Sequence, residues 1–334
     1  MAQRLILPGE LGDVFTPAEA LRFGISAGRL DRHPRVAAPF SGVRVRVDPP
    51  RQEESPWDAW KRTAVLHARA YARVMPVGAF VGGFTALAVL GLPTPRWHPD
   101  AMPDPRVVEI SVFAPRRSVR ATGVLPRQIR PALCHVVTRD GIPVASPASV
   151  WAMLADRLTT HQLVALGDAI IRIPRIPPQP IERAGPPKGT LAQLKAAVEA
   201  GPRAGVETLR EAFGLVRQGS SSPGETEQRL VMLEAGLPEP VLDHDVYSAR
   251  GVLLGCSEIA YPRLRTAIEC EGDQHRTSRA QWDRDIDKYQ AYAEAGWSVM
   301  RATDRLIHRR TDENVRRIRT LMVRAGWRPG DPVV

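Results

Sequence analysis

Along residues 264–270, apolar or small side chains alternate with acids and threonine. A repeat of two predicts a half-buried β-strand, because successive strand side chains point to opposite faces of a sheet. Glu269 and Glu271 are two residues apart, so we expect them to share one face. Residues 272–273 are Gly-Asp and predict a turn, which places His275 in a short loop directly after the strand.

This arrangement of acids defines a candidate site. Two carboxylates about 7 Å apart on one face of a strand repel each other unless a cation lies between them. Carboxylates at the end of a core strand, with a histidine close by, are what a hard divalent ion and an activated water require. The alternative is an exposed edge strand whose acids are simply solvated.

The rest of the second half predicts a mixed α/β architecture. After two leading helices, the order is a helix, three strands, a helix, a strand and a final helix, which is typical of a mixed sheet flanked by helices. The predicted helices cover residues 191–200, 206–216, 225–234, 278–295 and one continuous stretch from 304 onward, and the predicted strands cover 241–247, 252–261, 264–270 and 297–303.

Two further acids occupy marked positions in this pattern. Glu225 falls in the first turn of the helix 225–234, where the helix dipole favours a carboxylate, and that preference alone can explain it. Glu258 lies near the end of the strand 252–261. In the helix 278–295, we expect the buried stripe to consist of Trp282, Ile286, Tyr289 and Ala293.

Residues 13–47 predict a small module of helix, turn, helix and hairpin. Thr16-Pro17-Ala18-Glu19 has the form of a capping box, and Ser26 can begin a second helix that runs to about Asp31. Residues 43–47 alternate valine with arginine, as in a β-wing with one basic face. This is the winged-helix order, in which the second helix reads a DNA groove. The candidate DNA-contact residues here are Arg29, Arg44 and Arg46; the alternative is a helical lead-in with a solvated basic face.

Composition narrows the partners and the compartment. The 334 residues carry a formal net charge of +10, which favours polyanionic partners, DNA first. Three isolated cysteines argue against a disulfide framework or a structural zinc site, and they indicate a reducing cytoplasm. Nine arginines against three acids lie between residues 301 and 328, and the candidate phosphate contacts among them are Arg309, Arg310, Arg316 and Arg317.

Residues 74–92 carry no charge and are long enough to cross a bilayer, but their prolines and glycines divide them. We expect a strand or turn followed by a short buried helix, and no membrane association. Six prolines lie between residues 173 and 187, which predicts an extended, semi-rigid linker.

The motifs T-P-A-E-A-L, G-G-F-T-A-L-A-V-L-G-L-P and G-I-P-V-A-S-P-A-S-V-W are spread through the first half. In these motifs the first half resembles the AbiEi family of antitoxin and regulator proteins, which have an N-terminal winged helix. The resemblance implies DNA binding and a cognate toxin as a partner. It implies no catalytic residue.

The second half contains S-P-G-E-T-E, then G-C-S-E-I-A-Y-P-R-L-R-T-A-I-E-C-E-G-D-Q-H-R, then W-D-R-D-I-D-K-Y and G-W-S-V-M-R. Residues 220–321 thereby resemble the restriction-endonuclease-like, or PD-(D/E)XK, superfamily, and within it the family related to very-short-patch-repair endonucleases. The resemblance implies Mg²⁺ or Mn²⁺ held by Glu258 and Glu269. The site residues that it implies are Glu225, Glu258, Glu269, Glu271, His275 and Asp285.

Two departures from that family pattern affect the expected chemistry. Glu258 and Glu271 stand where aspartate is usual, and each extra methylene moves the carboxylate oxygens by roughly 1.5 Å. Magnesium demands near-ideal octahedral geometry, so a longer ligand weakens its binding or admits manganese. The usual acid-x-Lys pair is absent because Glu271 occupies the lysine position, which leaves His275 as the candidate base.

The sequence therefore predicts an α/β protein with four parts: a winged-helix unit (1–52), an AbiEi-like α+β domain (53–172), a Pro-rich linker (173–190) and a nuclease-like domain (191–334). The expected function is metal-dependent hydrolysis of DNA phosphodiester bonds. The alternative is a non-enzymatic DNA-binding regulator or antitoxin of a type IV toxin–antitoxin system with a decayed nuclease fold. The sequence does not specify an oligomeric state.

Overall fold

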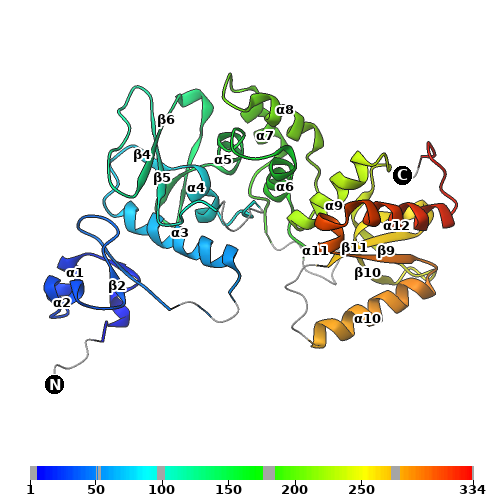
Figure 1. Cartoon of the computed structure of the whole chain (residues 1–334), viewed down its shortest axis with the longest axis horizontal. Coiled ribbons are helices and arrows are strands. Elements are labelled where there is room, and N and C mark those ends of the chain that lie inside the picture. The colour runs from blue at the N-terminus through cyan, green and yellow to red at the C-terminus, as the bar shows by residue number, and fades with distance from the viewer. Residues whose placement is uncertain are drawn as a thin grey trace. The chain divides into compact units, whose positions relative to one another are not determined.

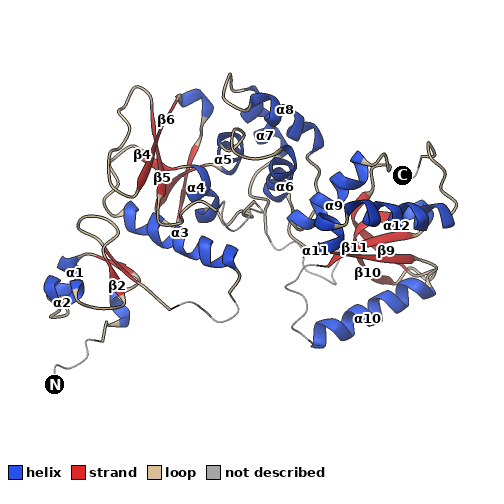
Figure 2. Ribbon diagram, viewed as in Figure 1, coloured by secondary structure: helices blue, strands red, loops and turns tan. Residues whose placement is uncertain are grey.

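A computed structural model of the chain describes residues 6–49, 51, 54–95, 102–175, 185–271 and 279–332. Its helices and three sheets form a mixed α/β protein, so the predicted fold class is confirmed. The elements are labelled in Figure 1, and Figure 2 distinguishes helices from strands. The chain forms two compact units, one of residues 1–158 with 193–206 and one of residues 159–192 with 207–334.

The first unit begins with a small module built on a three-stranded sheet in the order β1-β3-β2. Thr16 caps the first helix with the complete predicted capping box, since Thr16 and Glu19 exchange hydrogen bonds through side chain and backbone. The second helix begins after Ser26, as predicted. The elements are β1 (Val14–Phe15), α1 (Pro17–Leu21), α2 (Ala27–Asp31), β2 (Val36–Ala37) and β3 (Arg44–Arg46).

A five-stranded sheet in the order β6-β5-β4-β8-β7 forms the rest of the first unit. The uncharged residues 74–92 form a short strand and a short buried helix, as predicted. Among the described residues, no helix combines the length and apolar character needed to cross a membrane. The elements are α3 (Pro56–Ala72), β4 (Ala79–Val81), α4 (Gly83–Val89), β5 (Val108–Phe113), β6 (Val124–Ile129), β7 (Val136–Arg139), β8 (Ile142–Ala145) and α5 (Pro147–Met153).

The second unit contains a four-stranded sheet in the order β12-β11-β10-β9, in which only the β11–β12 pair is parallel. Apolar side chains of α9, α11 and α12 pack on one face and those of α10 on the other. The elements are α6 (Thr160–Ile171), α8 (Val206–Leu215), α9 (Pro223–Glu234), β9 (Val241–Tyr247), β10 (Leu253–Tyr261), β11 (Thr266–Glu271), α10 (Arg279–Glu294), β12 (Ser298–Thr303), α11 (Asp304–Arg309) and α12 (Thr311–Arg324).

The two compact units divide the chain at other positions than the predicted linker. Helix α6, assigned from sequence to the first half, packs on α9 in the second unit. Residues 193–206, which include most of α7 (Leu191–Glu199), belong to the first unit. At the start of the proline-rich stretch, Arg175 donates a hydrogen bond to Asp245 on β9 at 2.5 Å. Residues 176–184 lie outside the described part of the chain.

Two predicted elements are corrected. The expected single helix from residue 304 is two helices, because the backbone leaves the helical region at Arg310 (φ −130°, ψ 46°). On α10, Ile286 is 49% exposed, whereas Tyr292 is fully buried against Ala267 of the sheet. The side of α10 that packs on the sheet is therefore not the predicted one. A sequence period gives the spacing of buried positions but does not specify which side of the helix faces the sheet.

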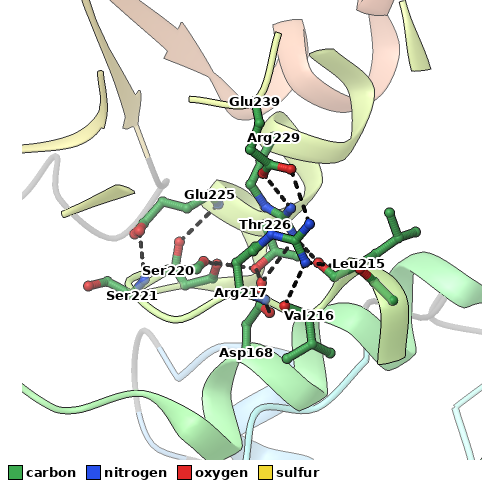
Figure 3. A network of polar contacts seen from close by, with 12 residues as sticks. Asp168, Leu215, Val216, Arg217, Ser220, Ser221, Glu225, Thr226, Arg229 and Glu239 are labelled. Carbon is green, nitrogen blue, oxygen red and sulfur yellow. Dashed lines mark hydrogen bonds and ion pairs between the residues drawn. The ribbon is translucent and has the colours of Figure 1, made fainter. Parts of the chain in front are cut away.

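A buried polar network fixes the start of α9 against α6 (Figure 3). Asp168 of α6 is 1% exposed and accepts hydrogen bonds from the Arg217 backbone N–H at 2.7 Å and from Thr226 Oγ1 at 2.8 Å. Arg229, with no exposed surface, lies 3.6 Å from Asp168 and also pairs with Glu239 at 2.8 Å. Burial raises the pKa of Asp168 to about 6. The network therefore joins α6, the end of α8 and the first two turns of α9.

Removing the buried acid should destabilise the second unit. We expect Asp168→Ala to lower the free energy of unfolding by about 3–5 kcal/mol, because it leaves the buried Arg229 cation without its buried counter-charge. Chemical denaturation followed by tryptophan fluorescence measures the change. Glu239→Ala is the matched control: Glu239 binds the same guanidinium but is 38% exposed, so its loss should cost about 1 kcal/mol or less. Equal losses in the two variants would contradict a dominant role for Asp168.

Candidate active site

Glu225 is held at the first turn of α9. Ser222 caps this helix, and its Oγ accepts the Glu225 backbone N–H at 3.2 Å. The Glu225 carboxylate in turn accepts the Ser221 N–H at 2.6 Å, as Figure 3 shows. Ser220 Oγ lies 2.8 Å from Thr226 Oγ1 and so connects this turn to the network around Asp168. Glu225 is only 3% exposed, which goes beyond the simple dipole preference expected from its position.

Glu258 and Glu269 meet where β10 and β11 stop pairing. The recorded pairs of these strands end at Ile259 opposite Ile268, and each glutamate is the next residue beyond that pair. Glu258 Oε2 accepts the Cys270 backbone N–H at 2.6 Å, so a carboxylate occupies the place of the next ladder hydrogen bond. Glu269 is 5% exposed. Its Oε1 is buried without a hydrogen-bond partner among the described residues.

The three carboxylates interact electrostatically. Burial raises the pKa of Glu225 to about 7, against the lowering effect of its hydrogen-bond donors. Burial, followed by repulsion from the carboxylates of Glu225 and Glu269, raises the pKa of Glu258 to about 9. Burial also raises the pKa of the Cys270 thiol far above its usual value, so this cysteine stays neutral. Glu225, Glu258 and Glu269 therefore lie close enough for their charges to act on one another.

Glu271 has a different environment from these three acids. Arg301 on β12 donates a hydrogen bond to Glu271 at 2.5 Å, and the Tyr289 hydroxyl lies 3.4 Å from the same oxygen. Asp285 on α10 lies near this group, since its charge raises the pKa of Tyr289. The structure thus gives Glu271 its own cation, in contrast to the expectation that it completes the acidic cluster. His275 lies outside the described residues.

Lys288 is a site residue that the sequence reasoning missed. It extends from α10 and donates a hydrogen bond to Glu269 Oε2 at 2.8 Å, with its side chain 23% exposed. Gly255 on β10 lies beside this side chain: a Cβ there would make an ordinary contact with Lys288 Cγ at 3.4 Å and a tight one with the Tyr292 hydroxyl at 3.1 Å. The rarity of lysine could have pointed to this residue. Only four of the 46 basic residues are lysines, and Lys288 lies in the motif W-D-R-D-I-D-K-Y.

The chemistry of this cluster suits a hard divalent cation. Carboxylate oxygens are the ligands that Mg²⁺ and Mn²⁺ prefer, and Glu269 Oε1 is a buried acceptor without a donor. The geometry is less complete. Glu225 and Glu258 each bind a backbone N–H with one oxygen. Within the described ranges, no three histidine, cysteine or acidic side chains are already arranged as a metal site. A cation would therefore bind at Glu258 and Glu269 with some adjustment of these side chains.

The candidate DNA-contact arginines divide into paired and unpaired groups. Arg310 and Arg317 both pair with Glu313, whereas Arg309 and Arg316 are exposed and have no ion pair among the described residues. Arg316 also lines an open cavity of about 730 Å³ between α9 and α12.

In the first unit, Arg44 is held by Asp31 at 2.8 Å and Arg46 donates to the Pro8 carbonyl at 2.8 Å. Phosphate contact would require these two arginines to release their present partners. Arg29 of α2 is exposed, so it is the member of the predicted set that is available without rearrangement.

Two proteins of Mycobacterium tuberculosis are similar to this chain: the uncharacterized proteins MT2308, of strain CDC 1551 / Oshkosh, and Rv2248, of strain ATCC 25618 / H37Rv. Each is 27% identical over 229 residues, which make up 68% of this chain and 78% of the relative. No model of a known protein family matches the chain. No solved structure matches it significantly.

The raised pKa values predict a coupling between pH and cation binding. The pKa of Glu258 is about 9 in the folded protein and usually near 4.5. The protonated Glu258 carboxyl group therefore contributes fully to the stability of the fold below about pH 4.5, and this contribution is lost as pH rises through 9. We therefore expect the melting temperature to fall from pH 6 to 9, and added Mn²⁺ or Mg²⁺ to restore it increasingly over that range.

Thermal melts with and without each cation measure this effect, and they do not depend on catalysis. Glu258→Gln should remove its own part of the pH dependence and leave the part due to His161, whose pKa is also raised to about 9 by Glu227 and Glu234. Glu269→Gln should abolish the cation effect. Glu271→Gln is the control, because Arg301 already neutralises that carboxylate. A cation effect that is independent of pH and persists in Glu269→Gln would contradict binding at this cluster.

Proposed function

We propose that this protein is a metal-dependent DNA endonuclease whose site consists of Glu225, Glu258, Glu269 and Lys288. The observation that carries the proposal is the convergence of the buried carboxylates of Glu225 and Glu269 with the half-buried carboxylate of Glu258, at the point where two core strands separate, and the lysine bound to Glu269. Such a cluster is costly for folding alone, because buried like charges repel. Its three glutamates are among the six residues implied by the resemblance to PD-(D/E)XK nucleases, whereas Lys288 is not.

Each residue of the cluster has a distinct role in this proposal. Glu258 and Glu269 would hold Mg²⁺ or Mn²⁺, which when bound polarises the phosphate and lowers the pKa of the attacking water. Glu225, with a pKa of about 7, is suited to accept a proton near neutral pH. His275 keeps its predicted role as a base or proton relay.

In the usual acid-x-Lys pair, the lysine occupies the strand position that Glu271 holds here. Lys288 supplies that positive charge from α10 instead. Its ammonium group is oriented by Glu269 and is partly exposed, so it can approach a phosphate oxygen from the side of α10. A fixed cation beside a reacting phosphate stabilises the charge that develops on its oxygens. The missing acid-x-Lys pair therefore does not exclude catalysis, because a lysine from another element reaches the same carboxylate.

The second candidate is a non-enzymatic DNA-binding regulator or antitoxin with a toxin partner. Two observations favour it: the small module formed by α1, α2 and the β2–β3 hairpin, with Arg29 exposed, and the lack of a ready metal site among the described residues. Both candidates place the protein in the cytoplasm with DNA as its partner, which agrees with three free cysteines and a net charge of +10.

Lys288→Met tests the proposed catalytic cluster. Methionine keeps most of the side-chain volume and removes the cation, so we expect cleavage of plasmid or duplex DNA in Mg²⁺ or Mn²⁺ to fall by about 10²–10⁴-fold, the range for one positioned catalytic group. Glu269→Gln should have at least the same effect, and DNA affinity should change little in either variant.

Lys195→Met is the matched control for this experiment, because Lys195 is 63% exposed on α7 and should be neutral. A Lys288→Met variant that cuts DNA as well as the parent would remove Lys288 from the site. A parent protein that binds DNA but cuts none, with either metal and with single- and double-stranded substrates, would favour the regulator.

The salt dependence of DNA binding tests the basic surface of α11 and α12. Each phosphate contact contributes about −0.9 to the slope of log affinity against log salt concentration. We expect Arg309→Ala with Arg316→Ala to flatten the slope by about 1.8. Arg310→Ala with Arg317→Ala should change it less, since Glu313 already binds both. Fluorescence anisotropy at several salt concentrations measures the slope. An unchanged slope in the first double variant would exclude this surface.

A further inference from the structure

The β9–β10 hairpin continues past the last pair between β10 and β11. Strand β10 pairs with β11 only from Ile259 to Tyr261, whereas it pairs with β9 from Leu253 onward. The segment from Val252 to Glu258 and its partner β9 therefore form a two-stranded ribbon, whose base is covered by α10 where Val246 is fully buried in a cluster with Tyr292. At about 3.3 Å per residue, the ribbon places its tip roughly 20 Å from the carboxylate cluster.

Hydrogen bonds fix the conformation of the tip. The Ser248 N–H donates to the Val252 carbonyl at 2.8 Å, and the Gly251 N–H donates to the Ser248 carbonyl at 3.0 Å. Ser248 Oγ accepts the backbone N–H of Arg250 at 3.3 Å and of Val252 at 3.1 Å. Gly251 has φ +76°, a left-handed value that glycine adopts without strain. The turn is thus an ordered support for the side chains around it.

These side chains are unusual for a solvent-facing turn. Tyr247 is 49% exposed and Val252 is 60% exposed, and the two flank the turn on its two strands. Arg250 at the tip is exposed and has no ion pair among the described residues. An exposed aromatic ring, a branched aliphatic side chain and a guanidinium are therefore all found within six residues at the tip of the hairpin.

The acids of the ribbon are only partly balanced by a cation. Arg175 pairs with Asp243 at 3.0 Å and with Asp245 at 2.5 Å, and both acids belong to β9. Cys256 of β10 also donates to Asp243, at 2.9 Å. One guanidinium balances one of these two carboxylates, so one negative charge remains nearer the base of the ribbon, whereas the charge at its tip is that of Arg250.

We propose that this hairpin tip enters the major groove of duplex DNA and reads bases beside the cleavage site. The major groove is about 12 Å wide and admits a two-stranded ribbon, whereas the minor groove, about 6 Å wide, does not. Arg250 matches the paired acceptors O6 and N7 of guanine, and Val252 and Tyr247 offer apolar surface to thymine methyl groups. The inference rests on the proposed function, because it takes DNA as the substrate of the same unit.

The length of the ribbon sets where the bases are read. A separation of about 20 Å corresponds to roughly six base pairs at 3.4 Å per pair, so the preferred bases lie about six pairs from the cut phosphate. Double-stranded RNA is a poor fit, because its major groove is deep and narrow. The ribbon thus distinguishes the two duplexes by groove shape as well as by base.

Sequencing of bound and cut molecules from a pool of random 40-base-pair duplexes tests this inference with the full chain. We expect the parent to enrich a short motif in which Arg250→Ala lowers discrimination at a guanine by about 5- to 150-fold, the range for one bidentate base contact. Tyr247→Ala should weaken selection at the neighbouring positions while leaving the salt slope of binding unchanged, because an apolar contact releases no counterions.

Matched variants separate this role from folding and from catalysis. Leu191→Ala changes an equally exposed apolar residue (49%) on α7 and should behave as the parent, and all variants should melt at the parent temperature. Glu269→Gln should keep the bound motif and lose the cuts, so the hairpin can be tested even if no cleavage occurs. A motif unchanged in Arg250→Ala and Tyr247→Ala, or equal competition by RNA duplexes, would overturn the hairpin proposal. Failure of the parent to bind any DNA would overturn both proposals.

Discussion

The buried contact between Asp168 and Arg229 is the constraint on which the second unit depends. Asp168, Glu239 and the Leu215 carbonyl, from three segments, contact the terminal nitrogens of a guanidinium that has no exposed surface. Because an unpaired buried charge is very costly, α9 has one favourable position against α6. The position of α9 also fixes Ser222 and the first turn of the helix. Glu225 therefore lies near the point where β10 and β11 stop pairing. A contact between α6 and α9 thus determines where Glu225 lies.

The carboxylates of the cluster repel one another. Three carboxylates occupy a buried region with one lysine, and the raised pKa values of Glu225 and Glu258 express the resulting preference for a neutral form. Two events can relieve the repulsion: uptake of protons or arrival of a cation. Glu271 differs from these three acids, because its charge is already balanced by an ion pair with Arg301. Because Glu225, Glu258 and Glu269 repel one another, added positive charge is favourable among them and is not required beside Glu271.

Local pattern predicted most of the elements. The alternation at residues 264–270 became β11, the Thr16 capping box formed as expected, and the uncharged residues 74–92 divided into β4 and α4. These successes share a cause: strand alternation and helix caps depend on residues close in sequence. The errors concern relations between elements. The stripe of α10 that faces the sheet and the helix break at Arg310 depend on what packs against those segments, and no short window of sequence contains that information.

The candidate site shows the same division. The sequence by itself placed Glu269 in a core strand, Glu258 near the end of its neighbour and Glu225 in the first turn of a helix, because each position follows from a local period. Only the tertiary structure decided that Lys288 binds Glu269, that Arg301 takes Glu271, and that α6 supports α9 from across the proline-rich stretch. The physical reason is that these contacts join segments 19, 30 and 58 residues apart. Their formation depends on strand pairing, on helix packing and on the burial of charge, which exist only once the chain has folded.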